Sequence, residues 1–76
     1  MAKSIHTKAY GQFVELLRRE RVNAGLTQQD VADRLGKPQS YVAKIEGAER
    51  RIDVIEFLAL AKAIGADAAA IIKELQ

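Results

Sequence analysis

Four neighbouring residues combine an amide, a hydroxyl, a methyl group and an ammonium on what could be one helix face. Gln39, Ser40, Ala43 and Lys44 follow Pro38 at the spacing of one face of a short helix. In the major groove, Gln can form two hydrogen bonds with adenine, Lys favours guanine, Ser bonds several partners, and the methyl group of Ala can touch that of thymine. The four positions are therefore the first candidates for sequence recognition.

Positive charge is concentrated around these candidates. The chain has a formal net charge of +2, whereas the segment from Arg34 to Arg51 has five basic residues against two acidic ones, Glu46 and Glu49. A solvated surface could also produce such a charge run. However, an ordinary surface helix more often pairs Glu with Lys four residues apart, and the candidate face has no acidic residue before Glu46. The distribution therefore favours a surface that approaches phosphates.

Other chemistry has little support in the sequence. The chain has no cysteine and one histidine, His6, so disulfides and thiolate metal sites are excluded and no catalytic set is evident. A phosphate-binding loop at Gly36-Lys37 is excluded because Val31 stands where that motif needs glycine and Pro38 where it needs Ser or Thr. We therefore expect no enzyme, and neither a cofactor nor a metal.

The elements that position the candidates are predicted to be helices in a single domain. A chain of 76 residues has material for one core, and its composition is typical of a small all-α protein. Residues 1–7 have no periodic pattern and predict a flexible N-terminal arm, which leaves residues 8–76 as the domain. No segment has the roughly 20 apolar residues needed to cross a membrane, so we expect a cytoplasmic protein.

Helical spacing and capping residues predict five helices. The first extends from Lys8 to Ala24. The others are set by these start and stop residues: Thr27 and Gly36 for the second, Pro38 and Gly47 for the third, Asp53 and Gly65 for the fourth, Asp67 and Leu75 for the fifth. We expect the inner face of the fourth helix to consist of Val54, Phe57, Leu58, Ala61 and Ile64.

The second and third helices form a distinctive pair. Each has about eight residues, too few to be stable alone, so both must be held by packing on the others. Ala32 allows a close crossing, and the turn Gly36-Lys37-Pro38 has the length of a helix-turn-helix, whose helices meet at about 90 to 120°. The second helix of such a unit can enter the major groove. Geometry and charge together favour DNA binding.

The sequence resembles the Cro and phage-repressor type of helix-turn-helix proteins, also called the xenobiotic-response-element (XRE) family. The resemblance extends from about Val14 to Ile72, with "LRRERVNAGLTQQDVADRLGKPQSYVAKIEGAERR" and then "FLALAKAIGAD" matching the family pattern in residue types, spacing and order. It implies a compact, five-helix, lambda-repressor-like domain that binds double-stranded DNA. It also implies that Gln39, Ser40 and Lys44, with Ala43 beside them, contact bases.

The same resemblance implies contacts with DNA phosphates. Gln28 matches a family Gln that bonds a phosphate and braces the first residue of the recognition helix, although it could merely start its own helix. Lys37 and Arg50 flank the recognition helix and suit phosphate contacts. Tyr41 could touch the backbone or pack against the core edge, and Arg51 could instead be a solvated charge.

Two further groups of residues have implied structural roles. Arg21 and Glu46 match a family pair that forms a partly buried salt bridge between the first helix and the end of the third. The outer face of the fourth helix departs from the polar family pattern, and this face continues onto the fifth helix. The apolar residues concerned are Ile55, Ala59, Ala69, Ala70 and Ile72. They could form a homodimer surface, or reflect only the helix-favouring composition.

The resulting expectation is a small transcriptional regulator, a repressor that acts as a homodimer on an inverted-repeat operator. Two alternatives stay open. The first is the antitoxin of a toxin-antitoxin pair, which would have a protein partner as well as DNA. The second is a protein-interaction adaptor that has kept the fold and lost DNA binding.

Overall fold

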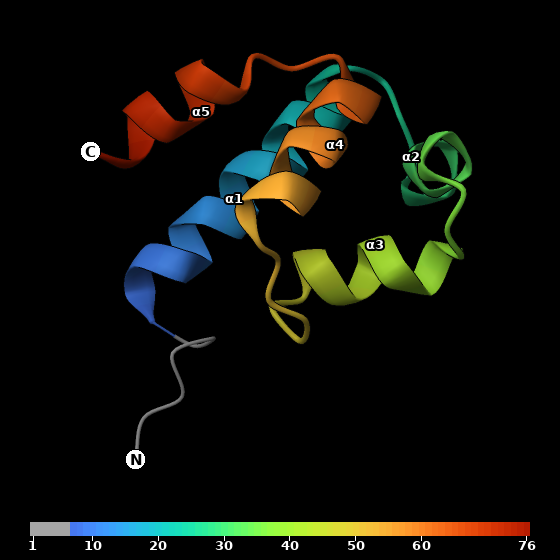
Figure 1. Ribbon diagram of the computed structural model, residues 1–76, viewed down its shortest axis with the longest axis horizontal. Helices are drawn as coiled ribbons and strands as arrows, with labels where there is room; N and C mark the ends of the chain where they lie inside the picture. The colour runs from blue at the N-terminus through green and yellow to red at the C-terminus, as the bar shows by residue number, and fades with distance from the viewer. Residues whose placement is uncertain (1–6) are drawn as a thin grey trace.

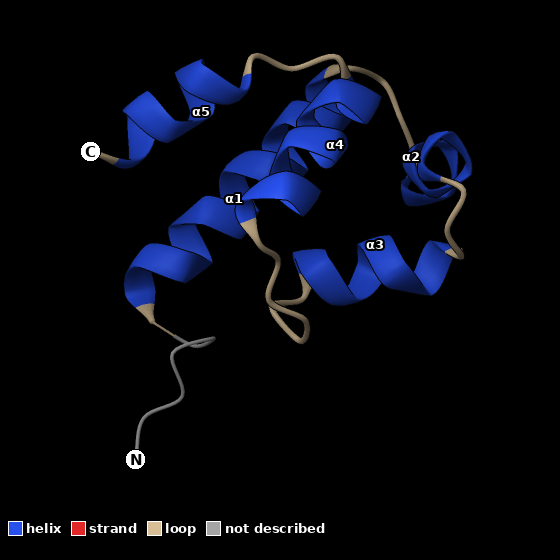
Figure 2. Cartoon of the chain, viewed as in Figure 1, coloured by secondary structure: helices blue, strands red, loops and turns tan. Residues whose placement is uncertain are grey.

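The structure, a computed structural model, describes residues 7–76, which form five α-helices and no strand within that range (Figures 1 and 2). The helices are α1 (Lys8–Asn23), α2 (Gln28–Leu35), α3 (Gln39–Glu46), α4 (Val54–Ile64) and α5 (Ala68–Leu75). The all-α, five-helix prediction is confirmed. Thr7, assigned to the N-terminal arm from sequence, is the N-cap of α1, and residues 1–6 of that arm lie outside the described residues.

Side-chain caps start the helices where the sequence predicts. The hydroxyl of Thr27 accepts a hydrogen bond from the backbone N–H of Asp30, whose carboxylate accepts one from the N–H of Thr27. Asp53 and Glu56 form the same reciprocal box at the start of α4. Such boxes satisfy N–H groups that have no partner within the helix. The first residues of α2 and α4 are fixed in this way.

The start of α3 differs by one residue from the prediction. Pro38 is the N-cap and not the first helical residue, because its φ of −70° and ψ of 155° are extended. No side chain caps this end of α3. The hydrogen bonds of the turn lie instead at the end of α2. There, Gly36 has a left-handed φ of 68°, and the N–H of Lys37 bonds the carbonyl of Ala32 at 2.9 Å.

One hydrophobic core joins the five helices. Its fully buried side chains come from α1, α2, α3 and α5 (Leu17, Val31, Val42, Ile45 and Ile71), and Ala32 is likewise inaccessible. Figure 1 shows α4 packed across the middle of the molecule, between α5 and the pair formed by α2 and α3. The short α2 and α3 are therefore held by tertiary packing, as helices of this length require.

The inner face of α4 was predicted only in part. Phe57, Ala61 and Ile64 are buried as expected, but Val54 is 68% exposed and Leu58 is 48% exposed. Leu60, which was not assigned to the core, is buried. Apolar residues occupy nearly every position of α4, so their spacing does not define one face.

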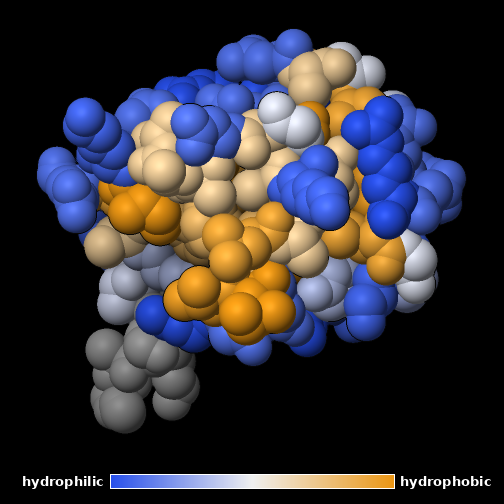
Figure 3. All heavy atoms as spheres, turned by 45° about the horizontal axis from the view of Figure 1, so that its top comes forward, coloured by the Kyte–Doolittle hydropathy of each residue, from blue (hydrophilic) through white to orange (hydrophobic). Residues whose placement is uncertain are grey.

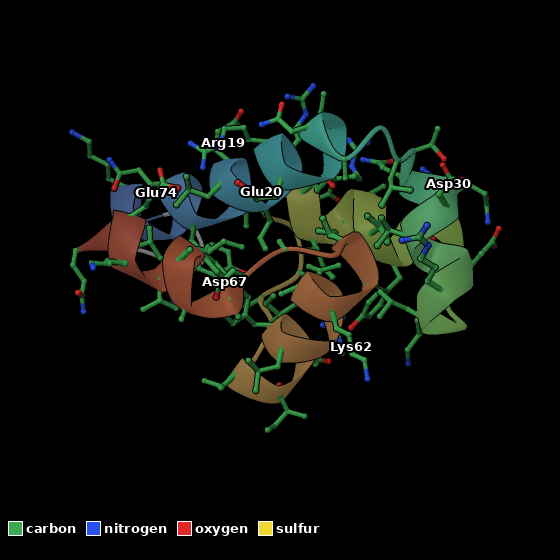
Figure 4. All side chains as sticks on the ribbon, turned by 90° about the horizontal axis from the view of Figure 1, so that it is seen from above. Arg19, Glu20, Asp30, Lys62, Asp67 and Glu74 are labelled. Carbon is green, nitrogen blue, oxygen red and sulfur yellow. The ribbon has the colours of Figure 1, made fainter. Side chains whose placement is uncertain are left out.

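Two polar contacts fix the outer elements. Arg19 of α1 forms an ion pair with Glu74 of α5 at 2.6 Å, and the two side chains point toward one another (Figure 4). On the other side, Arg34 of α2 donates to the carbonyl of Ala63 near the end of α4 at 2.8 Å. Among residues 7–76, no helix is long and apolar enough to span a membrane.

Candidate nucleic-acid interface

The recognition pair is formed by α2 and α3. Figure 1 shows α2 end-on while α3 runs across the view, so the two helices cross steeply. Val31 and Ala32 of α2 and Val42 and Ile45 of α3 are buried at or below 1% exposure. Because these residues hold the pair against the core, the opposite side of α3 is left free to face another molecule.

The four sequence candidates for base contacts share that opposite side. Gln39, Ser40 and Lys44 are exposed, and Ala43 is partly buried between them. All four lie within α3, and the first two are its first two residues. Their arrangement places an amide, a hydroxyl, a methyl group and an ammonium on one short surface, which is a set suited to the major groove.

A largely buried ion pair anchors the far end of α3. Nε and Nη2 of Arg21 donate to the two carboxylate oxygens of Glu46 at 2.6 and 2.9 Å, and the side chains are 11% and 7% exposed. Nη1 of Arg21 also donates to the carbonyl of Leu26, at 2.8 Å. The hydrogen bond with Glu46 raises the pKa of Arg21 above its ordinary value. The pair therefore joins α3 to α1 and to the loop before α2.

Gln28 lies between this ion pair and the start of α3. Its Nε2 donates to Glu46 at 3.0 Å, and its Oε1 accepts from Nε2 of Gln39 at 2.7 Å. The second contact is the brace that the family resemblance implies. The first was not predicted, because nothing in the spacing of Gln28 and Glu46 indicates that they meet.

Cations surround the ring of Tyr41, which is partly buried. Nζ of Lys37 lies 5.3 Å from the ring centroid, and the guanidinium carbon of Arg50 lies 4.8 Å from it. Burial is the main cause that raises the pKa of Tyr41, followed by the nearby carboxylate of Glu56. Tyr41 thus packs at the edge of α3 beside two charges suited to phosphates. This position fits both packing against the core edge and contact with the DNA backbone.

Arg50 and Arg51 have different surroundings. Arg50 forms an ion pair with Glu56 at 3.0 Å, which lowers the pKa of that carboxyl. Arg51 lies over the ring of Tyr10, 4.4 Å from its centroid, and so stands on the α1 side. The hydroxyl of Tyr10 in turn accepts from the N–H of Ile52 at 3.2 Å. The structure thus places Lys37 and Arg50 beside Tyr41 of α3, whereas Arg51 lies beside Tyr10 of α1.

The fold and this outward surface define a helix-turn-helix protein. A family model described as a helix-turn-helix domain matches residues 12–71. An XRE-family like protein from Pseudomonas syringae pv. tomato str. DC3000 is 47% identical, with 95% of this chain and 88% of that one covered and a TM-score of 0.88. The chain therefore belongs to the Cro/C1-type, or XRE, family of helix-turn-helix proteins, a family of DNA-binding regulators.

Other solved structures share the fold. The restriction-modification controller protein C.AhdI from Aeromonas hydrophila is 30% identical, with 79% of this chain and 91% of that one covered and a TM-score of 0.71. The controller protein C.Esp1396I, a tetramer in complex with its natural 35 base-pair operator, is 17% identical over 92% of both chains, with a TM-score of 0.83. No curated protein matched the chain.

Proposed function

We propose that this chain binds double-stranded DNA in a sequence-specific manner and regulates transcription by placing α3 in the major groove. The supporting observation is the exposed polar surface of Gln39, Ser40 and Lys44 on a helix whose other side is fixed in the core. On this proposal, these three residues and the methyl group of Ala43 contact bases.

Affinity on this proposal comes mainly from phosphate contacts. Gln28, Lys37, Tyr41 and Arg50 lie at the first turn of α2, in the turn, on α3 and after α3, where they flank the base-contacting surface. Neutralising phosphates releases counterions, so binding should weaken steeply as salt rises. Arg51, which stacks on Tyr10, is the weakest of the proposed phosphate contacts.

The proposed active form is a homodimer. Figure 3 shows hydrophobic side chains gathered on the face that carries α4 and α5, and exposed apolar residues of this face include Ile55, Ala59, Ala69 and Ile72. Beside it, an apolar groove of about 340 Å³ is lined in part by Val54 and Ile72. Contiguous exposed apolar surface of this kind often marks a protein interface. A two-fold dimer would place two α3 helices about 34 Å apart, one turn of DNA.

We propose that the protein represses transcription by occupying a promoter. Its proposed location is the cytoplasm. C.Esp1396I, which shares the fold, forms a tetramer on its own operator, and this supports a DNA-bound oligomer as the form proposed here. A dimer of this chain would bind an inverted repeat, because a two-fold protein matches a two-fold DNA site.

Selection from random duplexes at low salt tests the proposal. We expect an inverted repeat with half-site centres about one helical turn apart. Failure to enrich any sequence would contradict DNA recognition and favour the adaptor alternative. Co-purification of a second polypeptide that covers the α4 and α5 face would favour the antitoxin alternative.

A further inference from the structure

A carboxylate lies beside one of the cations that we propose as phosphate contacts. Nη2 of Arg50 donates to Oε2 of Glu56 at 3.0 Å, and the two side chains are 39% and 30% exposed. The other oxygen of the carboxylate, Oε1, accepts from the backbone N–H of Asp53, also at 3.0 Å. Glu56 therefore uses one oxygen to cap α4 and the other to hold Arg50.

The capping box keeps this carboxylate in place independently of Arg50. The N–H of Glu56 donates to Oδ1 of Asp53 at 2.7 Å, so the two residues hold one another at the start of α4. The hydrogen bond from Arg50 lowers the pKa of Glu56, and its carboxyl group is therefore charged at neutral pH. A fixed negative charge thus lies at the edge of the proposed DNA-binding surface.

The two cations beside Tyr41 differ in their pairing. The ammonium of Lys37 lies 5.3 Å from the centroid of the Tyr41 ring, and the guanidinium carbon of Arg50 lies 4.8 Å from it. Arg50 is paired with Glu56, whereas Lys37 forms no ion pair with any of residues 7–76. Two neighbouring positive charges are therefore unequally available to a phosphate.

A phosphate and the carboxylate of Glu56 make the same demand on Arg50. Both anions accept hydrogen bonds from the N–H groups of a guanidinium. A phosphate that binds Arg50 must therefore displace Glu56, or approach a pair whose net charge is near zero. Either route gains less than binding to an unpaired arginine.

We propose that Glu56 competes with DNA phosphates for Arg50 and thereby limits the affinity of the protein for DNA. This inference rests on the proposed DNA-binding function. Because phosphate contacts do not depend on base sequence, the limit should be the same for the operator and for unrelated DNA. A purely structural Glu56 predicts the opposite result, since loss of its ion pair would loosen the segment that carries Arg50 and weaken binding.

The test measures the affinity of Glu56→Gln for two duplexes, the operator found by selection and a duplex of unrelated sequence. Glutamine keeps an oxygen for the N–H of Asp53, and it removes the charge that neutralises Arg50. We expect about threefold tighter binding to both duplexes at about 50 mM salt, because one more phosphate is neutralised. The slope of log affinity against log salt should become steeper by about 0.9.

Two comparisons separate competition for Arg50 from a general effect of charge. Glu74→Gln makes the same change in net charge at the α1–α5 ion pair and should change affinity by less than about twofold, because salt screens distant charges. In an Arg50→Ala background, the gain from Glu56→Gln should also fall below about twofold. A gain that persists without Arg50 would overturn the inference, as would unchanged or weaker binding by a folded Glu56→Gln protein.

If Glu56→Gln does not fold, Arg50→Ala and Lys37→Ala decide. The salt slope should fall by about one when Lys37 is lost and by clearly less when Arg50 is lost, because Glu56 already neutralises Arg50. Equal falls would overturn the inference while leaving DNA binding intact. Absence of binding to both duplexes by the wild-type protein would instead overturn the proposed function itself.

Discussion

The side chains of Arg21 and Glu46 meet in a two-pronged ion pair, with N–O distances of 2.6 and 2.9 Å, that joins α1 to the last residue of α3. Both side chains are largely buried. Because α3 has only eight residues, this pair fixes one end of the proposed recognition helix while Val42 and Ile45 fix its inner face. The ion pair therefore orients and stabilises α3, and we expect it to make no contact with bases.

Replacing Arg21 with Ala should strongly destabilise the domain. Removal of one partner leaves a buried charge without compensation, which typically costs about 3 to 5 kcal/mol, a large part of the stability of a small domain. Urea denaturation followed by circular dichroism would measure the change. Arg18→Ala is the control, because its ion pair with Glu15 is exposed and should contribute at most about 1 kcal/mol. Intact stability together with loss of DNA binding would contradict this role.

Lys44→Ala and Lys37→Ala should weaken DNA binding in different ways. Lys44 lies on the base-contacting side of α3, so its loss should relax the preference at one base pair at a cost of about 1 to 3 kcal/mol. Lys37 lies in the turn, so its loss should weaken binding to all sequences and lower the slope of log affinity against log salt by about one. Titrations at several salt concentrations would separate the two effects. Equal effects of both changes on every sequence would contradict the assignment of Lys44 to bases and of Lys37 to phosphates.

Ile55→Glu should prevent self-association. Ile55 is 73% exposed on α4, and a carboxylate at this place would have to be buried without a partner in the proposed dimer. Sedimentation equilibrium at tens of micromolar should show a dimer for the wild-type protein and a monomer for the variant. Val22→Glu, at a half-exposed apolar residue of α1, should remain dimeric. A monomeric wild-type protein would contradict a preformed dimer.

Glu56→Gln should destabilise the protein more at neutral pH than at acid pH. Hydrogen bonds from Arg50 and from the backbone N–H of Asp53 hold the pKa of Glu56 below its ordinary value of 4.5. The folded state therefore binds this proton more weakly than the unfolded state. The stabilisation is present above pH 4.5 and is lost as the pH falls through the lowered pKa. Glutamine can keep the capping box but not the ion pair.

Urea denaturation of both proteins at a series of pH values would check this expectation. The difference in unfolding free energy between wild type and Glu56→Gln should be greatest near pH 7 and should narrow below pH 4.5. Two curves that stay parallel from pH 7 to pH 3 would show that the charge of Glu56 has no part in stability.

Helix positions could be predicted from the sequence because their determinants are local. Thr27, Asp53 and Asp67 cap their own helices, and Gly36 and Gly65 end theirs, as the sequence indicates. The start of α3 was misplaced by one residue because Pro38 suits either the N-cap or the first helical position.

Tertiary contacts could be predicted less completely. The exposure of Val54 and Leu58 was missed because α4 is apolar on every side, so only its neighbours decide which face is buried. The bond between Gln28 and Glu46 and the ion pair between Arg50 and Glu56 join residues of different elements. No local pattern encodes such contacts. Exposure of the base-contacting set could be predicted, since Gln39, Ser40 and Lys44 lie opposite a clear apolar face.

Binding to operators with single 7-deaza purines tests most directly whether α3 enters the major groove. Replacement of N7 by carbon removes a major-groove acceptor and leaves the minor groove unchanged. We predict that the wild-type protein loses at least about fivefold in affinity at the purines contacted by Gln39 or Lys44, whereas Gln39→Ala and Lys44→Ala each become indifferent at their own position. Unchanged affinity for every 7-deaza duplex, with sensitivity only to removal of the guanine N2 amino group in the minor groove, would contradict the account.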